Sequence, residues 1–361
     1  MKNIENFKIQ EKQHIFMKTF FISVFLLLTI HFLLVSNYLF SFKFVPQKVM
    51  FNETEIFNVE ESKYLNPFTD ALLPIKNYQV NRILNNKRKI NTLLLGDSSL
   101  GYGIDISTFN QITKLESAKL ALNGSAGFEG ALGMLLEANR KHDIKNVILF
   151  FRTAQFIKHF EMRSFIVGVV KSQNDLGFIL SSYPSIINKF IENMFSTEIS
   201  LKSLNMLLTK VEEKIDVSFQ GDYFPLFDEK FLKDKKIPKS NAIFKTWSKK
   251  SIDDDLFYTL EAIKNICIKN DINCIYSHGP MLDLDCANQE KINSDYLDYL
   301  NEKIISIGFL LHSESPVCLP KKYFTERLLP GLFVDIINEE HKVKTTKIYA
   351  SDINKFIYQN D

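Results

Sequence analysis

The longest run of uncharged, mostly apolar residues lies near the N-terminus, between Lys18 and Lys43. It covers residues 19–42, and a helix needs about 20 apolar residues to cross a bilayer. Backbone groups in the dry core of a bilayer must pair within their own segment, so this run predicts a transmembrane helix. A buried core helix is one alternative, although such a helix rarely stays apolar on every face over several turns.

A cleaved signal peptide is a second alternative for this run. The apolar part of a signal peptide spans about 7–15 residues and ends at a small-residue cleavage site. Residues 19–42 are longer and end on Tyr38-Leu39-Phe40-Ser41-Phe42, without an A-x-A pattern. We therefore expect the helix to be retained, with its aromatic end in the headgroup layer. His31 lies in the middle of the run, where a polar side chain is functional or faces a partner helix.

Basic residues flank this run unequally. Four lysines precede it within residues 1–18, whereas only Lys43 and Lys48 follow it closely. The positive-inside rule then keeps residues 1–18 in the cytoplasm. We expect a single-pass protein of the cell membrane, in contact with the lipid bilayer. Its C-terminal domain is expected to be extracytoplasmic, in the periplasm or on the outer face.

From residue 90 onward, short apolar runs alternate with amphipathic stretches. Short apolar runs that stop at Gly or polar residues are typical of buried strands in a parallel sheet. The pattern predicts strands at 90–95, 118–122, 146–151, 273–277 and 308–312, and helices at 105–116, 128–141, 254–269, 288–307 and 341–357. This alternation predicts an α/β fold with right-handed crossovers and a parallel sheet that helices cover on both faces, a three-layer α/β/α sandwich.

Two stretches do not follow this alternation. Residues 43–89 carry few signals and are expected to connect the membrane helix to an α/β domain at 90–361. Residues 160–250 contain amphipathic helical stretches at 185–195 and 199–215, followed by a Lys-rich segment. We expect a helical insertion that caps the cleft or faces the membrane or a partner. A packing layer with no further role is the alternative.

Composition limits the function classes. The net charge of +2 gives no electrostatic footprint for binding nucleic acid, so no nucleic-acid partner is expected. The four cysteines show no C-x-x-C spacing, and neither a P-loop nor a zinc signature occurs, so we expect no metal and no cofactor. In an oxidising compartment, one pair of cysteines could form a disulfide.

The first candidate for chemistry is Gly96-Asp97-Ser98-Ser99, where the first strand gives way to a helix. In open α/β sheets, ligands bind at the carboxyl ends of the strands. Ser98 could present its hydroxyl there as a nucleophile, close to backbone N–H groups that hold a developing oxyanion. A turn that ends a strand uses the same residue types for structural reasons alone.

Two further sequence blocks support Ser98 as a candidate nucleophile. Asn123-Gly124-Ser125-Ala126-Gly127 follows the second strand, and a glycine there lets a backbone N–H approach a substrate closely. His341 begins the last predicted helix and could act as the general base that a serine nucleophile needs. The base needs an orienting residue, for which the local candidates are Asp335, Asn338 and Glu339. An ordinary turn and a surface histidine are the alternatives.

Together these blocks resemble the SGNH, or GDSL-like, hydrolase superfamily in order and approximate spacing, over about 250 residues interrupted by the insertion. The resemblance implies an SGNH/flavodoxin-like fold with Ser98 as nucleophile and His341 as base. It also implies an oxyanion-hole N–H from Gly124, or less directly from Gly127. The membrane-anchored layout looks like that of relatives in cell-surface polysaccharide acylation, such as alginate O-acetylation and teichoic acid D-alanylation proteins.

The sequence departs from the family pattern in two places. After the third strand the family carries an Asn, whereas this chain has Arg152, Thr153 and Gln155 as the available oxyanion donors. The Asp of the family's Asp-x-x-His block is Asn338 here. An Asn can orient an imidazole but stabilises an imidazolium less than a carboxylate does.

The function expected from this resemblance is a membrane-tethered, extracytoplasmic serine acyl-transfer enzyme, an O-acyltransferase or esterase acting on a cell-surface glycan. The alternative is a catalytically weak or inactive SGNH-like module that scaffolds a membrane-bound O-acyltransferase. A multi-spanning acyltransferase is therefore the candidate protein partner, and a glycan is the candidate substrate.

Overall fold

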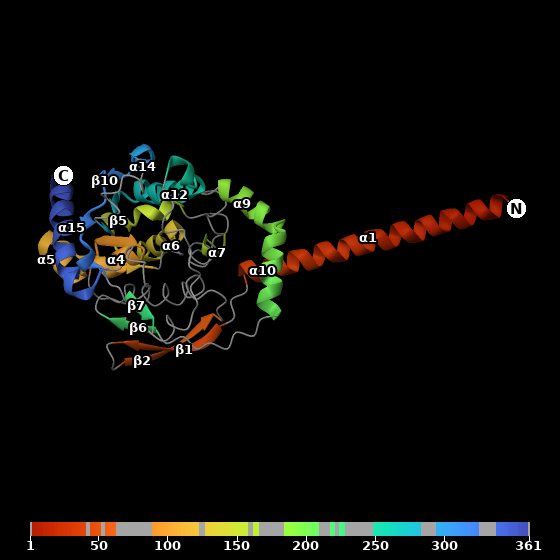
Figure 1. The fold of residues 1–361 in the computed structure, drawn as a ribbon, viewed down its shortest axis with the longest axis horizontal. Coiled ribbons are helices and arrows are strands. Elements are labelled where there is room, and N and C mark those ends of the chain that lie inside the picture. The colour runs from red at the N-terminus through yellow and green to blue at the C-terminus, as the bar shows by residue number, and fades with distance from the viewer. Residues whose placement is uncertain are drawn as a thin grey trace. The chain divides into compact units, whose positions relative to one another are not determined.

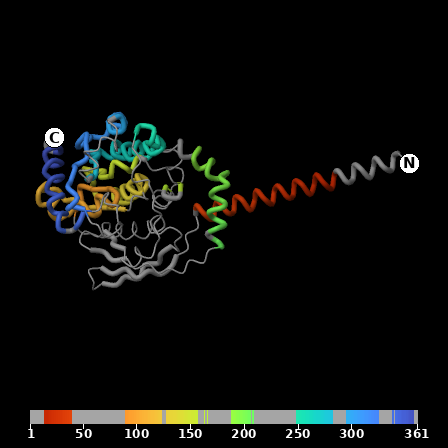
Figure 2. Tube along the Cα trace, in the orientation of Figure 1, coloured from red at the N-terminus to blue at the C-terminus, as the bar shows by residue number. Residues whose placement is uncertain are grey.

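The structure is a computed structural model, and its Cα trace is drawn in Figure 2. It describes residues 2–40, 44–51, 55–62, 89–122, 127–157, 162–165, 184–208, 217–220, 224–227, 248–282, 294–324 and 337–359. The chain folds as two compact units. The N-terminal unit comprises Met1–Phe42 and Ser185–Val211, and the larger unit comprises Lys43–Pro184 and Glu212–Asp361.

The N-terminal unit contains one long helix and two short ones (Figure 1). The long helix, α1, spans Lys2–Phe40, and the short helices are α9 at Pro184–Met194 and α10 at Thr197–Leu208. Within α1, the stretch His14–Leu39 is long and apolar enough to cross a membrane, and it is the one such stretch among the described residues. A signal sequence near the N-terminus also passes this test of length and composition, and the structure confirms the apolar N-terminal helix.

The main sheet of the larger unit is parallel throughout. Its strands are β3 (Thr92–Gly96), β4 (Ser117–Ala121), β5 (Asn146–Phe151), β8 (Asn273–His278) and β10 (Leu310–Leu311). They lie in the order β10-β8-β5-β3-β4, and every neighbouring pair is parallel. The predicted α/β fold with a parallel sheet is therefore confirmed, and each predicted strand lies within two residues of its observed ends.

Helices follow the strands as the amphipathic stretches predict. They are α4 (Ser98–Gly103), α5 (Ile106–Thr113), α6 (Gly127–Ala138), α12 (Asp255–Lys269), α14 (Ser294–Ile307) and α15 (Glu339–Gln359). The helix predicted at 105–116 ends earlier because Lys114 adopts a left-handed conformation, with φ of 61°. Short 3-10 turns occur at Thr153–Ile157, Lys249–Ser251 and Lys321–Tyr323.

Adjacent residues of the central strand β5 contact helices on opposite sides of the sheet. Phe150 lies 4.7 Å from the ring of Tyr349 in α15, whereas Phe151 lies 4.6 Å from the ring of Phe128 in α6. Successive side chains of a strand point to opposite faces. Helices α15 and α6 therefore cover the two faces, and the core on the α15 side continues through Leu94 and its neighbours.

The connector and the insertion also contribute a second sheet, which the sequence did not predict. Strands β1 (Phe44–Phe51) and β2 (Glu55–Ser62) form an antiparallel hairpin, and β6 (Val217–Gln220) and β7 (Phe224–Phe227) form another. The two hairpins join through parallel pairing of β1 with β6. The expectation of a purely helical insertion at 160–250 is therefore incomplete, although α7 (Met162–Phe165), α9 and α10 lie within it.

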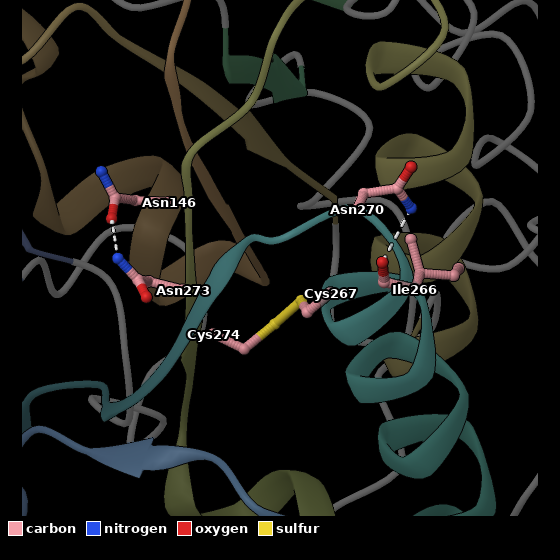
Figure 3. The surroundings of a disulfide bond; sticks show 6 residues. All are labelled: Asn146, Ile266, Cys267, Asn270, Asn273 and Cys274. Atoms are coloured by element: carbon pink, nitrogen blue, oxygen red, sulfur yellow. Dashed lines mark hydrogen bonds between the residues drawn. A yellow bond between two sulfur atoms is a disulfide. The ribbon is translucent and has the colours of Figure 1, made fainter.

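A disulfide links Cys267 near the end of α12 to Cys274 in β8, with the two Cα atoms 6.2 Å apart (Figure 3). Both cysteines are buried. Cys318, in the short strand β11 (Cys318–Leu319) that pairs with β9 (Met281–Leu282), is disulfide-bonded as well. Among the described residues, no cysteine is a free thiol.

Candidate active site

The order of the strands defines where a ligand site is expected. From β3 the chain moves to β4 on one side, and then to β5 on the other side of β3. This is the 2-1-3-4-5 order of doubly wound sheets, in which ligands bind where the order reverses, at the carboxyl ends of the strands. The reversal falls between β3 and β5, so the residues after Gly96 and after Phe151 face the predicted crevice.

Asp97 is the structural centre of this edge. Its side chain is 1% exposed, and Oδ1 accepts hydrogen bonds from Ser99 N at 2.9 Å and from Ser99 Oγ at 2.6 Å. The first of these contacts caps α4. Oδ2 accepts the backbone N–H of Arg152 at 3.3 Å and lies 3.4 Å from Arg152 Nε. Asp97 thus ties the end of β5 to the end of β3.

Ser98 begins α4, is half-buried and directly follows Asp97. The preceding Gly96 is required by space, because a Cβ atom there would run into the carbonyl oxygen of Phe150. At the other end of α4, Lys119 Nζ donates to the carbonyl oxygens of Gly101 at 3.0 Å and Ile104 at 2.7 Å. The helix that carries Ser98 is therefore held at both ends by buried side chains, by Asp97 at its own N-cap and by Lys119 of β4 at its C-terminal end.

Arg152 and Thr153, the predicted oxyanion donors, are largely occupied in the structure. The backbone N–H of Arg152 is used by Asp97, and its side chain is 19% exposed. Thr153 is fully buried, and its backbone oxygen accepts a hydrogen bond from Tyr296 at 2.6 Å. Its hydroxyl lies 3.5 Å from Nδ1 of His278. Both residues directly follow β5, and Thr153 has a structural role.

His278 supports this edge from β8. Its Nε2 lies 3.0 Å from Oδ1 of Asn301, and its backbone oxygen accepts a hydrogen bond from Tyr349 at 3.0 Å. Because Asn301 Nδ2 donates to the carbonyl of Glu314 at 2.8 Å, Oδ1 must be the acceptor, and the proton of His278 sits on Nε2. Burial lowers the pKa of His278 to about 4. The ring is therefore neutral at pH 7.

Gln155 is the remaining side chain that could serve as an oxyanion donor. It is 2% exposed, and its Oε1 has no hydrogen-bond partner among the described residues. Its Nε2 lies close to Gly127, where a Cβ atom would come within 3.4 Å of it. Gln155 follows β5 and Gly127 follows β4, and β3 lies between these strands. The Gln155 side chain therefore reaches across the carboxyl end of β3, where Ser98 lies.

Asn338 and His341, predicted as the orienting residue and the base, are in contact. Asn338 Nδ2 donates to the carbonyl oxygen of Lys322 at 2.7 Å, so its Oδ1 faces His341. That oxygen lies 2.7 Å from Nδ1 of His341 and 3.1 Å from its backbone N. An amide oxygen only accepts, so the ring proton sits on Nδ1, and Nε2 keeps its lone pair.

The imidazole also packs against an aromatic ring. The ring centroid of Tyr323 lies 4.2 Å from that of His341, with the two planes tilted by 47°, and the backbone oxygen of Tyr323 accepts a hydrogen bond from Asn338 N at 2.8 Å. Tyr323 therefore contacts both members of the pair. No local sequence pattern points to this residue, since its contact with His341 depends on the packing of residues 321–323 against the start of α15.

Ser98 and His341 lie at the same edge of the sheet. The Tyr349 hydroxyl donates a hydrogen bond to the backbone oxygen of His278, at the carboxyl end of β8. His341 lies about two turns before Tyr349 in α15, past the carboxyl ends of the strands. Ile337 also lies near Gly103, the last residue of the helix that Ser98 begins. Among the described residues, His341 has contacts with Asn338 and Tyr323, and no hydrogen bond joins it to Ser98. Their predicted proximity within about 4 Å stays a prediction.

Asn123, Gly124 and Asp335 lie outside the described residues, and their roles stay predictions. In the part of the chain that the structure describes, no group of three or more His, Cys, Asp or Glu side chains could hold a metal ion. Comparison of the chain with protein-family models, curated proteins and solved structures finds no match. A functional assignment therefore rests on the residues and their geometry.

Proposed function

We propose that the chain is a membrane-tethered, extracytoplasmic serine acyl-transfer enzyme of the SGNH type, with a three-layer α/β/α domain. The observation that carries this proposal is the Asn338–His341 hydrogen bond of 2.7 Å. It places the ring proton on Nδ1 and leaves Nε2 as a base at the edge where Ser98 lies. A serine hydroxyl needs such a base to become nucleophilic at neutral pH.

In the proposed reaction, Ser98 Oγ attacks an ester carbonyl while its proton passes to His341 Nε2. Nε2 then returns the proton to the leaving alcohol as the carbon–oxygen bond breaks, which leaves an acyl-serine. A glycan hydroxyl or water attacks this acyl group, with Nε2 again taking the proton and then returning it to Ser98 Oγ. Gln155, together with backbone N–H groups of the β3 and β4 turns, would stabilise the oxyanion.

The extracytoplasmic location is supported by the cysteines. The Cys267–Cys274 disulfide and the disulfide-bonded Cys318 are typical of oxidising compartments. This agrees with the lysine asymmetry around α1, which keeps the N-terminus inside. Anchoring by α1 would hold the enzyme beside a polymer that is made at the membrane, which raises the effective concentration of the substrate.

The test is labelling with a fluorophosphonate, which modifies activated serines, followed by mass spectrometry of the full-length protein. Ser98 should be labelled, and Ser98→Ala should abolish the label. Ser99→Ala is a matched control, because the Ser99 hydroxyl is buried and donates to Asp97, so its removal should leave Ser98 reactive. A label that persists in Ser98→Ala and disappears in Ser99→Ala would refute the assignment.

A second candidate is an inactive SGNH-like module that scaffolds a membrane O-acyltransferase. The absence of a hydrogen bond between Ser98 and His341 and the presence of an amide instead of a carboxylate at Asn338 favour it. In apo enzymes, however, catalytic hydrogen bonds are often long and tighten when substrate binds. An unlabelled Ser98 in a folded protein that nevertheless co-purifies with a multi-spanning acyltransferase would favour this second candidate.

A further inference from the structure

Helix α10 of the insertion binds the C-terminal part of α1 through polar side chains. His31, in α1, lies with Nε2 3.0 Å from the carbonyl oxygen of Met194 and with Nδ1 2.6 Å from Ser200 Oγ. A carbonyl oxygen only accepts, so Nε2 donates to it, and Nδ1 forms the second hydrogen bond, with the Ser200 hydroxyl. Both ring nitrogens of this polar residue in an apolar helix are therefore hydrogen-bonded.

More contacts follow along the same helix. Asn37 Nδ2 donates to Ser203 Oγ at 3.1 Å, and Phe32 lies edge-on to Phe195 with ring centroids 5.5 Å apart. Val35 and Leu39 are fully buried. Figure 1 shows α10 crossing α1 steeply near the C-terminal end of α1. The last two to three turns of α1 are therefore covered by protein.

The part of α1 that precedes these contacts exposes its apolar side chains. Among the side chains that the structure describes, they run from Ile15 to Ile30, before the first contact at His31. These 16 residues (30 − 15 + 1) extend about 24 Å at 1.5 Å per residue, which is most of the roughly 30 Å of a hydrocarbon core. Lys18 lies one turn inside this stretch and can extend its ammonium back to the headgroups. Helix α10 then crosses α1 at the outer boundary of the bilayer.

The surface of α10 has three distinct faces. Ile199, Ser200 and Ser203 are buried, and the two serines contact α1. Four leucines of α10 are exposed. Leu201, Leu204 and Leu208 recur at spacings of three and four, which places them on one helix face, whereas Leu207 lies toward the serine face. Polar side chains share another face, which includes the ion pair of Glu198 with Lys202, 2.8 Å apart.

The direction of the leucine face follows from the two serine contacts. Ser200 meets His31, whereas Ser203 meets Asn37, which is six residues, or about 9 Å, nearer the C-terminal end of α1. On the circumference of α10, the step from Ser203 to Ser200 therefore leads toward the exposed N-terminal part of α1. At about 100° per residue, Leu201, Leu204 and Leu208 lie a further 40 to 100° around the helix in the same direction. Lys202 lies about 200° from Ser200 in this direction, on the opposite side of the helix.

We propose that α10 is a second membrane-binding element, which lies at the outer boundary of the bilayer and inserts Leu201, Leu204 and Leu208 among the acyl chains. Glu198 and Lys202 point away from the membrane. An amphipathic helix of this kind buries its apolar face about 5–10 Å into the boundary of the headgroups and acyl chains. The leucine face is continuous with the exposed apolar surface of α1. The inference rests on the part of the proposed function in which α1 spans the membrane.

The test measures contact with lipid by fluorescence quenching in the full chain. Trp247→Phe removes the single native tryptophan, and one tryptophan is then introduced by Leu204→Trp. The protein is reconstituted into phosphatidylcholine vesicles whose acyl chains carry bromine near the headgroup or near the chain end. Leu204→Trp should lose about half of its emission or more with bromine near the headgroup, since the side chain reaches the upper acyl region. Quenching by bromine near the chain end should be weaker.

Two matched variants make the outcome decisive. Lys202→Trp, on the polar face of the same helix, should be quenched much less than Leu204→Trp. Leu26→Trp, in the exposed N-terminal part of α1, should be quenched most by bromine near the chain end. Equal, weak quenching at positions 202 and 204 with normal quenching at position 26 would overturn the proposal and leave the membrane span intact. If quenching at position 204 is absent and its emission shifts to the red on dilution of the protein in lipid, a second copy covers the leucines instead. Absence of quenching at position 26 would refute the span itself.

Discussion

Replacement of Asn338 by alanine tests the geometry that carries the proposed function. The change removes the oxygen that holds His341 Nδ1 at 2.7 Å and the amide that donates to Lys322. When the ring becomes an imidazolium in the transition state, this hydrogen bond is charge-assisted and contributes about 1.5–3 kcal/mol. At 1.36 kcal/mol per tenfold in rate, kcat should fall about 10- to 150-fold, with little change in KM.

The assay is hydrolysis of p-nitrophenyl acetate by the full-length protein in detergent, together with the rate of fluorophosphonate labelling. Asn270→Ala is the matched control, because Asn270 Nδ2 makes a similar bond of 2.8 Å to the carbonyl oxygen of Ile266, in α12 (Figure 3). It should leave both rates unchanged. Wild-type rates in Asn338→Ala, with Ser98→Ala inactive, would refute the reasoning and show that another group orients His341.

The aspartate variant separates two contributions of Asn338. Asn338→Asp supplies a carboxylate, which stabilises an imidazolium better than an amide does. It also loses the donor to Lys322 and places an oxygen against that carbonyl. We expect Asn338→Asp to be clearly more active than Asn338→Ala. A rate at or below that of the alanine variant would mean that the contact with Lys322 matters more than the charge.

The remaining predictions concern stability and topology. Burial lowers the pKa of His278 to about 4, so the folded state keeps this ring neutral while the unfolded chain binds a proton below about pH 6.5. The free energy of unfolding should therefore fall by about 3 kcal/mol as pH falls from about 6.5 to about 4. The decline in the urea midpoint over this range should be smaller in His278→Gln, and an unchanged slope would contradict the assignment. The double variant Cys267→Ala/Cys274→Ala opens a short loop and should lower the unfolding free energy by about 2 kcal/mol in urea titration; equal stability of wild type and variant without reductant would contradict this. A reporter that is active only outside the cytoplasm, fused after Asp361, should be active, whereas activity of a cytoplasm-only reporter there would reverse the assigned orientation.

The main sheet could be predicted because its strands are buried on both faces. Runs such as residues 146–151 are then almost wholly apolar, and Gly or polar residues end them. The hairpin of β1 and β2 was missed because its strands mix charged and apolar residues without strict alternation, for example in Glu55–Ser62. Its pairing with β6 joins segments about 170 residues apart, which no local pattern reveals.

In the candidate site, too, contacts that follow from a local sequence pattern differ from contacts that depend on long-range pairing. Asn338 was one of three local candidates, and its amide oxygen contacts His341 while its amide nitrogen donates to the carbonyl of Lys322. Asp335 lies outside the described residues, so the orienting role of Asn338 stays a prediction. Asp97, by contrast, was seen only as part of a motif. Its cap on α4 follows from the sequence, since Asp is a favoured N-cap residue. Its bond to Arg152 depends on the register of β3 beside β5 and could not be predicted.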